Sequence, residues 1–229
     1  MSAAAASAIP GKAEQARFLD STVGKKAVMA ITGAMLFVFV IGHMLGNLQV
    51  YLGPEKINAY GALLHSAPGL LWAARIGLLL AVGLHIISAV QLAALNRKAR
   101  PVAYVRKKNV TSNYASRTML VSGPILFFFI VYHLLHFTTG QAHPQFREGD
   151  VYHNLVAGFQ QPAAAIAYII AMIMLANHLY HGVWSMFQSL GVSHPKYTPM
   201  LRQFAAIAAI LIAIGNISIP VSVMTGLIK

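Results

Sequence analysis

Five long apolar stretches constrain this chain more than any other feature, because each has about the 20 residues that an α-helix needs to cross a bilayer. They cover approximately residues 28–50, 70–95, 117–139, 162–188 and 203–227. Lipid offers the backbone no hydrogen-bond partners, so each stretch is expected to be helical. The sequence therefore predicts an all-α membrane protein, in which residues 1–229 form a single domain of five transmembrane helices. A composition of 57% hydrophobic and 10% charged residues is too apolar for a soluble domain of this size.

The basic residues are unevenly distributed, and their placement predicts topology. Three connecting segments carry most of them: Lys12, Arg17, Lys25 and Lys26; Arg97, Lys98, Arg100, Arg106, Lys107 and Lys108; Lys196 and Arg202. The positive-inside rule places these segments in the cytoplasm, with the N-terminus inside and the C-terminus outside. This explains the excess of 17 basic over five acidic residues without a nucleic-acid partner. Residues 1–20 are expected to form a cytoplasmic tail, since MSAAAASAIPGK lacks the features of a signal peptide.

The absence of cysteine limits the redox chemistry that this chain can hold. No disulfide, thiolate metal ligand, iron–sulfur cluster or covalently attached c-type haem is available to a chain with no Cys. Any redox centre must be bound by other side chains.

Histidine is the residue type that such an apolar chain should avoid, yet the sequence contains ten. Ionisable side chains inside a span are costly and usually functional. Six are predicted to lie well inside the spans: His43, His85, His133, His136, His178 and His181. Any one of them alone is equally well explained as a neutral imidazole that bonds a neighbouring helix.

The depths of four histidines favour a shared role. His43 and His133 lie 15 and 16 residues into spans that run outward, and His85 and His178 lie 15 and 16 residues into spans that run inward. Each pair therefore comes from two parallel helices at one level, the arrangement that a bis-histidine haem b requires. A rise of about 1.5 Å per residue puts the two levels roughly 10–15 Å apart. The sequence predicts two stacked haems b.

His136 and His181 are each three residues beyond a predicted ligand, on the same helix face. His136 matches the depth of His43 less well than His133 does. We interpret both as groups that bond a haem propionate, a water or a quinone. A helix-end histidine satisfied by solvent remains an equal alternative for each.

Several segments resemble one known family. They are TVGKKAVMAITGAMLFVFVIGHMLGN (residues 22–47), NAYGALLHSAPGLLWAARIGLLLAVGLHIISAV, YHLLHF and HLYHGVWSMFQSLG. In this order they are similar to the membrane subunit of type B succinate:quinone oxidoreductases, the five-helix diheme cytochrome b of succinate dehydrogenases and fumarate reductases. The resemblance covers about residues 17–227.

The resemblance implies roles for residues and for partners. It implies His43 and His133 as ligands of the distal haem iron, and His85 and His178 as ligands of the proximal one. It also implies a cytoplasmic flavoprotein subunit with FAD, an iron–sulfur subunit, a bacterial inner-membrane location, and menaquinone or another quinone as the electron acceptor. Such a complex works in the tricarboxylic acid cycle as respiratory complex II, with the succinate site on another chain. A higher oligomer remains open.

Two further sets of candidates lie near the predicted membrane ends. Quinone-binding candidates at the outer end are His65, Asn47, Gln49, Tyr51, Tyr60 and Trp72. Candidates for haem propionates and the surroundings of the haems are Arg75, His136, His181, Lys25, Arg117 and Ser21. A helix-end Trp or Tyr is more often an interfacial anchor, which is the competing interpretation for the aromatic residues.

Two observations bear on the direction and on rival functions. Some fumarate reductases of the family carry a Glu two positions before the fourth-helix ligand, where this chain has Ala176, which favours succinate oxidation. Rival interpretations are the membrane cytochrome of a hydrogenase or formate dehydrogenase, and a haem-free transporter whose histidines relay protons.

Overall fold

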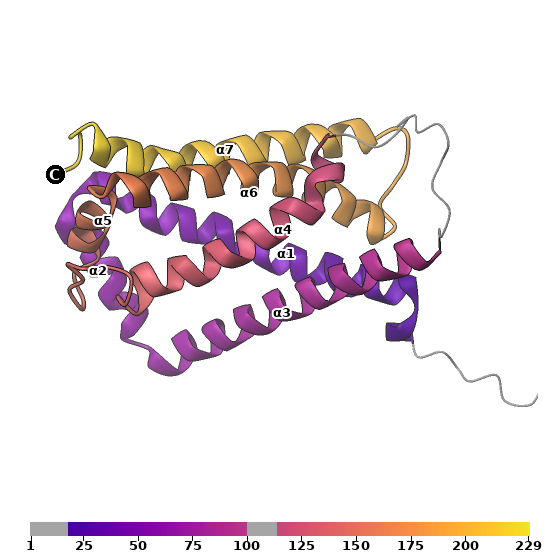
Figure 1. Ribbon diagram of the computed structural model, residues 1–229, viewed down its shortest axis with the longest axis horizontal. Helices are drawn as coiled ribbons and strands as arrows, with labels where there is room; N and C mark the ends of the chain where they lie inside the picture. The colour runs from indigo at the N-terminus through magenta and orange to yellow at the C-terminus, as the bar shows by residue number, and fades with distance from the viewer. Residues whose placement is uncertain (1–17, 100–113) are drawn as a thin grey trace, which may run out of the picture.

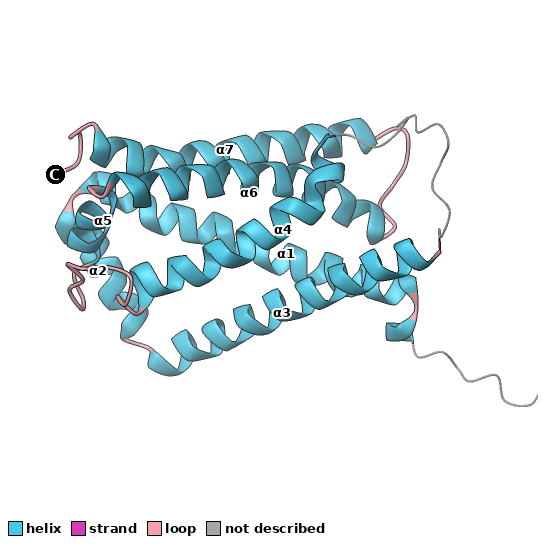
Figure 2. Ribbon diagram, in the orientation of Figure 1, coloured by secondary structure: helices cyan, strands magenta, loops and turns pink. Residues whose placement is uncertain are grey.

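The computed structural model describes residues 18–99 and 114–229. Within these ranges the chain forms helices joined by loops and turns, with no strand (Figure 2). The expected N-terminal tail before Phe18 and the basic residues Arg100, Arg106, Lys107 and Lys108 lie outside the described residues.

Five helices are long and apolar enough to cross a membrane, which confirms the predicted number of spans. They are Thr22–Leu52 (α1, Thr22–Asn47, continued by η2, Leu48–Leu52), Pro68–Lys98 (α3), Tyr114–Thr138 (α4, Tyr114–His133, continued by the π-helical turn η3, Leu134–Thr138), Pro162–Ser189 (α6) and Thr198–Met224 (α7).

The first span begins six residues before the predicted position 28, for a local reason. The Ser21 hydroxyl accepts a hydrogen bond from the Gly24 amide at 2.9 Å and so caps the N-terminus of α1. Because the helix begins directly after Ser21, it contains Lys25 and Lys26, although neither residue belongs to the apolar stretch.

The long helices form an elongated bundle in which α1 and α6 are central (Figure 1). Helix α1 packs closely on α3 and α6, α4 packs on α6, and α7 covers the other side of α6. Neither α1 with α4 nor α3 with α6 is a closely packed pair. Small residues allow close approach between membrane helices, and Ala205 and Ala209 of α7 are buried at such a contact.

Two short helices close one end of the bundle, which we call the α2–α5 end. They are α2 (Pro54–His65) and α5 (Val151–Phe159). The Asn58 side chain joins them, since its amide donates to the Asp150 carboxylate at 3.0 Å and its carbonyl oxygen accepts from the Tyr152 amide at 2.9 Å. Asp150 also caps α5 by accepting from the His153 amide at 3.1 Å.

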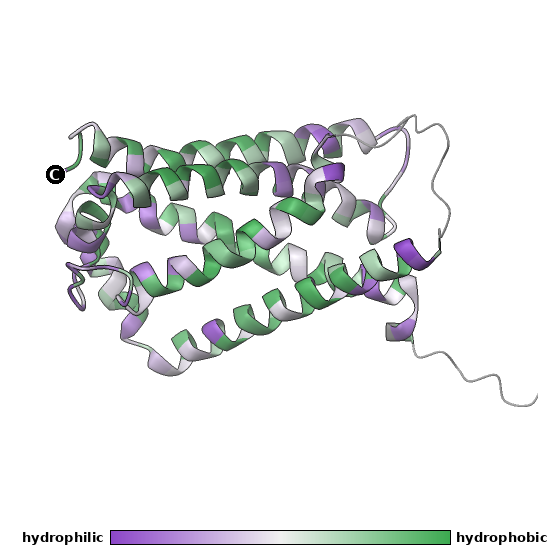
Figure 3. Cartoon of the chain, viewed as in Figure 1, coloured by the Kyte–Doolittle hydropathy of each residue, from purple (hydrophilic) through white to green (hydrophobic). Residues whose placement is uncertain are grey.

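Hydrophobic residues dominate the middle of the long helices, and hydrophilic ones gather toward both ends (Figure 3). The end opposite α2 and α5 holds most of the basic side chains described. We call it the basic end, and it includes Lys25, Lys26, Arg97, Lys98, Arg117, Lys196 and Arg202.

Candidate functional site: two histidine pairs inside the bundle

The four predicted ligands meet in the two predicted pairs. The ring centroids of His43 and His133 lie 5.6 Å apart, and those of His85 and His178 lie 6.2 Å apart. A metal ion held by two imidazole nitrogens, at the roughly 2 Å typical of such bonds, separates the ring centroids by about 6 Å. Both pairs therefore have the spacing of two ligands on opposite sides of one ion.

Each pair connects two helices that do not pack closely on each other. His43 and His133 belong to α1 and α4, and His85 and His178 belong to α3 and α6. Because the paired helices stand apart while neighbouring helices touch, the imidazoles reach toward each other across the gap between their helices, where His43 is exposed and the other three are half-buried. This is the arrangement in which a group can be bound in the core of a bundle.

The two pairs lie at different levels, and three helices give similar separations. Thr32, which contacts His85, and His43 are 11 positions apart on α1. Ser122, which contacts His178, and His133 are 11 positions apart on α4, and Tyr168 and His178 are ten apart on α6. At 1.5 Å per residue the levels are about 15–16.5 Å apart, at or just above the upper limit of the predicted range.

Hydrogen bonds fix the orientation of His85. Its Nδ1 lies 3.1 Å from the Met29 carbonyl oxygen and 3.3 Å from the Thr32 hydroxyl oxygen. A carbonyl oxygen only accepts, so we assign the ring proton to Nδ1, which leaves a lone pair on Nε2. The same division is usual in metal-binding histidines, where one nitrogen bonds the protein and the other the metal.

His178 is held in the same way from α4. Its Nδ1 lies 3.3 Å from the Ser122 hydroxyl, which is buried and itself lies 3.5 Å from the Met119 carbonyl oxygen. If the hydroxyl donates to that carbonyl, it accepts from Nδ1, and Nε2 of His178 is again free. In this pair each Nδ1 therefore contacts a hydroxyl of a neighbouring helix, Thr32 of α1 for His85 and Ser122 of α4 for His178.

The second pair has a different support. The Nδ1 of His133 lies 3.1 Å from the hydroxyl of Tyr168, which also lies 3.2 Å from Nδ1 of His136. Tyr168 is 7% exposed and packs against Phe129, Phe137 and Phe159. His43 stacks on Phe39 with the ring centroids 5.3 Å apart.

The position next to His178 on α6 is not filled by a neighbouring side chain. Gly182 lies one turn beyond His178 on the same face of α6, and a Cβ added there meets no atom of the described chain within 4 Å. His181 carries the one buried side-chain nitrogen without a hydrogen-bond partner in the described ranges, Nδ1. Such an orphaned polar atom inside a protein calls for a partner. The donor set, the open space and the orphaned nitrogen all fit a bis-histidine haem.

The other propionate candidates are spread over both ends of the bundle. At the basic end, Ser21 caps α1, Lys25 donates to the Asp20 carbonyl oxygen at 2.8 Å, and Arg117 is exposed. Toward the α2–α5 end, the Arg75 guanidinium lies over the Trp72 ring, 5.2 Å from its centroid. These groups lie near the ends of the spans.

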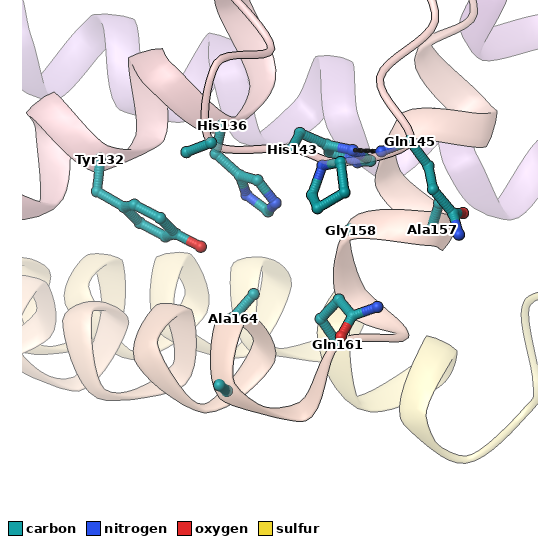
Figure 4. Close-up of a pocket in the computed structure, with 11 residues that line it drawn as sticks. Tyr132, His136, His143, Gln145, Ala157, Gly158, Gln161 and Ala164 are labelled. Atoms are coloured by element: carbon teal, nitrogen blue, oxygen red, sulfur yellow. Dashed lines mark hydrogen bonds between the residues drawn. The ribbon is translucent and has the colours of Figure 1, made fainter.

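The six quinone candidates all lie toward the α2–α5 end. Asn47 donates to the His43 carbonyl oxygen at 2.8 Å, Tyr51 bonds Ser222 at 2.9 Å, and His65 bonds the Gly61 carbonyl at 2.8 Å. The Tyr60 ring packs on Gly46, Gln49 is half-buried in η2, and Trp72 is 58% exposed. A cavity at this end has other lining residues (Figure 4).

Sequence reasoning missed the residues that hold the imidazoles, namely Thr32, Ser122 and Tyr168. A signal for two of them is present in the sequence. Thr32 precedes His43 by 11 positions, and Ser122 precedes His133 by the same 11 positions. A hydroxyl at that spacing on each of these two parallel helices lies at the level of the other pair.

Fold and site together define a class: an integral membrane protein of five apolar helices with histidines of separate helices paired between them. The family model described as succinate dehydrogenase/fumarate reductase transmembrane subunit matches residues 93–216, more than half of the chain. The chain belongs to this family, whose members are subunits of complexes that carry the catalytic site for the dicarboxylate on other chains. No curated protein and no solved structure matches the chain.

Proposed function

We propose that this chain is the diheme cytochrome b that anchors a type B succinate dehydrogenase and passes electrons from its iron–sulfur subunit to a quinone. The observation that carries the proposal is the presence of two facing histidine pairs at two levels, with ring centroids 5.6 and 6.2 Å apart. Haem b, when bound at each level, supplies a one-electron carrier. The family match favours this function over that of a hydrogenase or formate dehydrogenase cytochrome.

In this proposal His85 and His178 hold the haem nearer the basic end, which we call the inner haem. His43 and His133, the outer pair, hold the haem nearer the α2–α5 end, which we call the outer haem. The task of the chain is to orient the four imidazoles. Thr32 and Met29 fix His85, Ser122 fixes His178, and Tyr168 fixes His133. Fixed Nδ1 atoms keep Nε2 directed at the metal and raise its basicity.

The surroundings of the haems are proposed from the same geometry. His181, with its unpartnered buried Nδ1, is placed to bond a propionate of the haem nearer the basic end. Arg75, at the other end, is the corresponding candidate for the outer haem, and Lys25, Arg117 and Ser21 remain candidates at the basic end. His136 is a neighbour of the outer pair and not an iron ligand, because it is the His133 ring that faces His43, with the ring centroids 5.6 Å apart.

We place the basic end in the cytoplasm, so that the N-terminus is inside and the C-terminus outside a bacterial inner membrane. Lys25, Lys26, Arg97 and Lys98 support this orientation by the positive-inside rule. The flavoprotein and the iron–sulfur subunit then dock on the basic end, and the quinone is reduced at the α2–α5 end. All 229 residues are proposed to form one domain.

Purification of the intact complex tests this function. A flavoprotein and an iron–sulfur protein should copurify, and added succinate should reduce haem b in the visible spectrum. A complex whose haem is reduced by formate or hydrogen and not by succinate would point to the other dehydrogenases. A colourless protein would favour the proton-relay transporter.

A further inference from the structure

A cavity of about 290 Å³ opens at the α2–α5 end, between η3, the connection 139–150, α5 and the start of α6. Figure 4 shows Tyr132, His136, His143 and Gln161 around it, with Ala164 on the opposite wall. We call it the η3–α6 pocket. None of its lining residues is Asp, Glu, Lys or Arg, so it suits a neutral ligand.

His136 is the most constrained polar side chain of the pocket. It is 2% exposed, and its ring is stacked between Tyr132, 5.2 Å away at 16°, and His143, 4.9 Å away at 28°. Its Nδ1 bonds Tyr168, whereas its Nε2 has no hydrogen bond within the described residues. This nitrogen is not one of the fully enclosed atoms of the described residues, so it is accessible from the pocket and is left for a ligand there.

Hydrogen-bond counting decides what this nitrogen offers. If His133 binds iron through Nε2, its Nδ1 carries the proton and donates it to the Tyr168 oxygen. The single hydroxyl proton of Tyr168 is then directed to Nδ1 of His136. His136 must therefore carry its own proton on Nε2, and it presents an N–H donor to the pocket.

The remaining polar groups complete the description. Both ring nitrogens of His143 are engaged, Nε2 with the Asn154 carbonyl oxygen at 2.9 Å and Nδ1 with the Gln145 amide at 3.2 Å, so this ring is a wall. The Tyr132 hydroxyl and the side-chain amide of Gln161 have no hydrogen-bond partner in the described ranges, and both residues line the same space. Flat aromatic walls with a few donors suit a planar ring that bears carbonyl oxygens.

We propose that the η3–α6 pocket binds the ring of a quinone, with Nε2–H of His136 donating to one quinone carbonyl oxygen. The inference rests on the proposed function, and it moves the quinone site away from the six residues predicted from the sequence. Tyr168 then connects the two tasks, since one hydroxyl holds both the iron ligand His133 and the quinone donor His136.

A photoreactive azido-naphthoquinone, added to the intact complex, tests the site. Cross-links mapped by mass spectrometry should fall on the segments 132–145 and 157–164, which line the pocket. Ala164→Leu fills the pocket and should lower this labelling at least tenfold. Ala167→Leu, one turn further on the exposed face of α6, is the matched control and should label like the unmodified complex.

His136→Leu should weaken naphthoquinone binding by up to about tenfold, the usual cost of one hydrogen bond, while both haems stay bound. Labelling that falls elsewhere, or that Ala164→Leu leaves unchanged, would overturn the pocket assignment. Haem content and reduction by succinate are measured on the same samples. If succinate reduces the haem and the label is elsewhere, only the pocket is wrong, whereas haem that succinate leaves oxidised contradicts the proposed function itself.

Discussion

The Nδ1 atom of His85 on α3 lies 3.1 Å from the carbonyl oxygen of Met29 on α1, so the backbone of one span fixes the ring of another. Thr32, one turn further along α1, adds its hydroxyl at 3.3 Å. On the other side of the interior, Ser122 does the same for His178. Hydrogen bonds from the protein itself therefore orient the imidazoles of His85 and His178.

The first prediction concerns this support. Ser122→Ala removes the hydroxyl at Nδ1 of His178 and should weaken retention of the inner haem about 10- to 100-fold, as is typical when the hydrogen-bond partner of a metal ligand is lost. Transfer of haem to an excess of a haem-scavenging protein measures the change. Ser185→Ala is the control, because the Ser185 hydroxyl bonds only the Gly182 carbonyl of its own helix. Equal retention in both variants would refute the role of Ser122.

Tyr168→Phe should raise the midpoint potential of the outer haem, with little effect on the inner one. Without the hydroxyl, Nδ1 of His133 loses its partner and the imidazole becomes a weaker electron donor to ferric iron. A tenfold change in the relative stability of the two oxidation states corresponds to about 59 mV for one electron, and we expect a shift of that order. A spectroscopic redox titration measures it. Tyr180→Phe, on the same helix, should leave both potentials in place.

Gly182→Leu tests the space beside His178. A Cβ at this position meets no neighbouring atom of the described chain within 4 Å, so the first atom of the new side chain displaces nothing. The leucine should nevertheless exclude the inner haem, because it occupies the side of α6 that His178 faces. Gly83→Leu is the control, since a Cβ there also has open space but lies on the opposite side of α3 from His85. Full haem content in Gly182→Leu would mean that the open space is not a haem site.

The pH dependence of the α2–α5 end follows from Asp150. Hydrogen bonds from the His153 amide and the Asn58 side chain hold the pKa of this carboxyl below its ordinary value. A carboxyl with a lowered folded-state pKa stabilises the fold above its unfolded pKa of about 3.9, and this contribution is lost as the pH falls through the folded value. Cleavage of the connection 139–150 by pepsin should therefore accelerate as the pH drops below about 4.

In the Asp150→Ala variant, pepsin should cleave that connection rapidly at every pH at which pepsin is active. The variant has neither the cap of α5 nor the hydrogen bond to Asn58. Glu148→Ala, at an exposed neighbouring position, should behave like the unmodified protein. An acid-independent cleavage rate in the unmodified protein would show that Asp150 does not hold this end together.

The five spans and the meeting of the paired histidines could be predicted because both depend on quantities that a sequence contains directly. Span length follows from apolar runs, and depth follows from the helical rise per residue. His43 and His133 lie at nearly the same number of residues from the predicted starts of two different spans. The centroids of their rings are 5.6 Å apart for this reason.

The supports of the imidazoles and the η3–α6 pocket could not be predicted in the same way. Which side chain faces an imidazole depends on the rotation of a neighbouring helix about its axis, so Tyr168 could not be assigned to His133 from depth alone. The pocket requires the π-helical turn at His136 and the packing of α5, whose cap at Asp150 involves a residue of α2. Helix α2 is too short to be stable alone. It is stabilised by tertiary contacts, which its one fully buried side chain, Ile57, makes with the hydrophobic cluster.

The most direct test of the account is a pyridine haemochrome count on the purified complex, combined with substitution of one histidine from each pair. We expect two haems b per chain in the unmodified protein, loss of the outer haem in His43→Ala, loss of the inner one in His85→Ala, and retention of both in His136→Ala. A protein without haem b, or one in which His136→Ala removes an iron ligand while His133→Ala does not, would contradict the account.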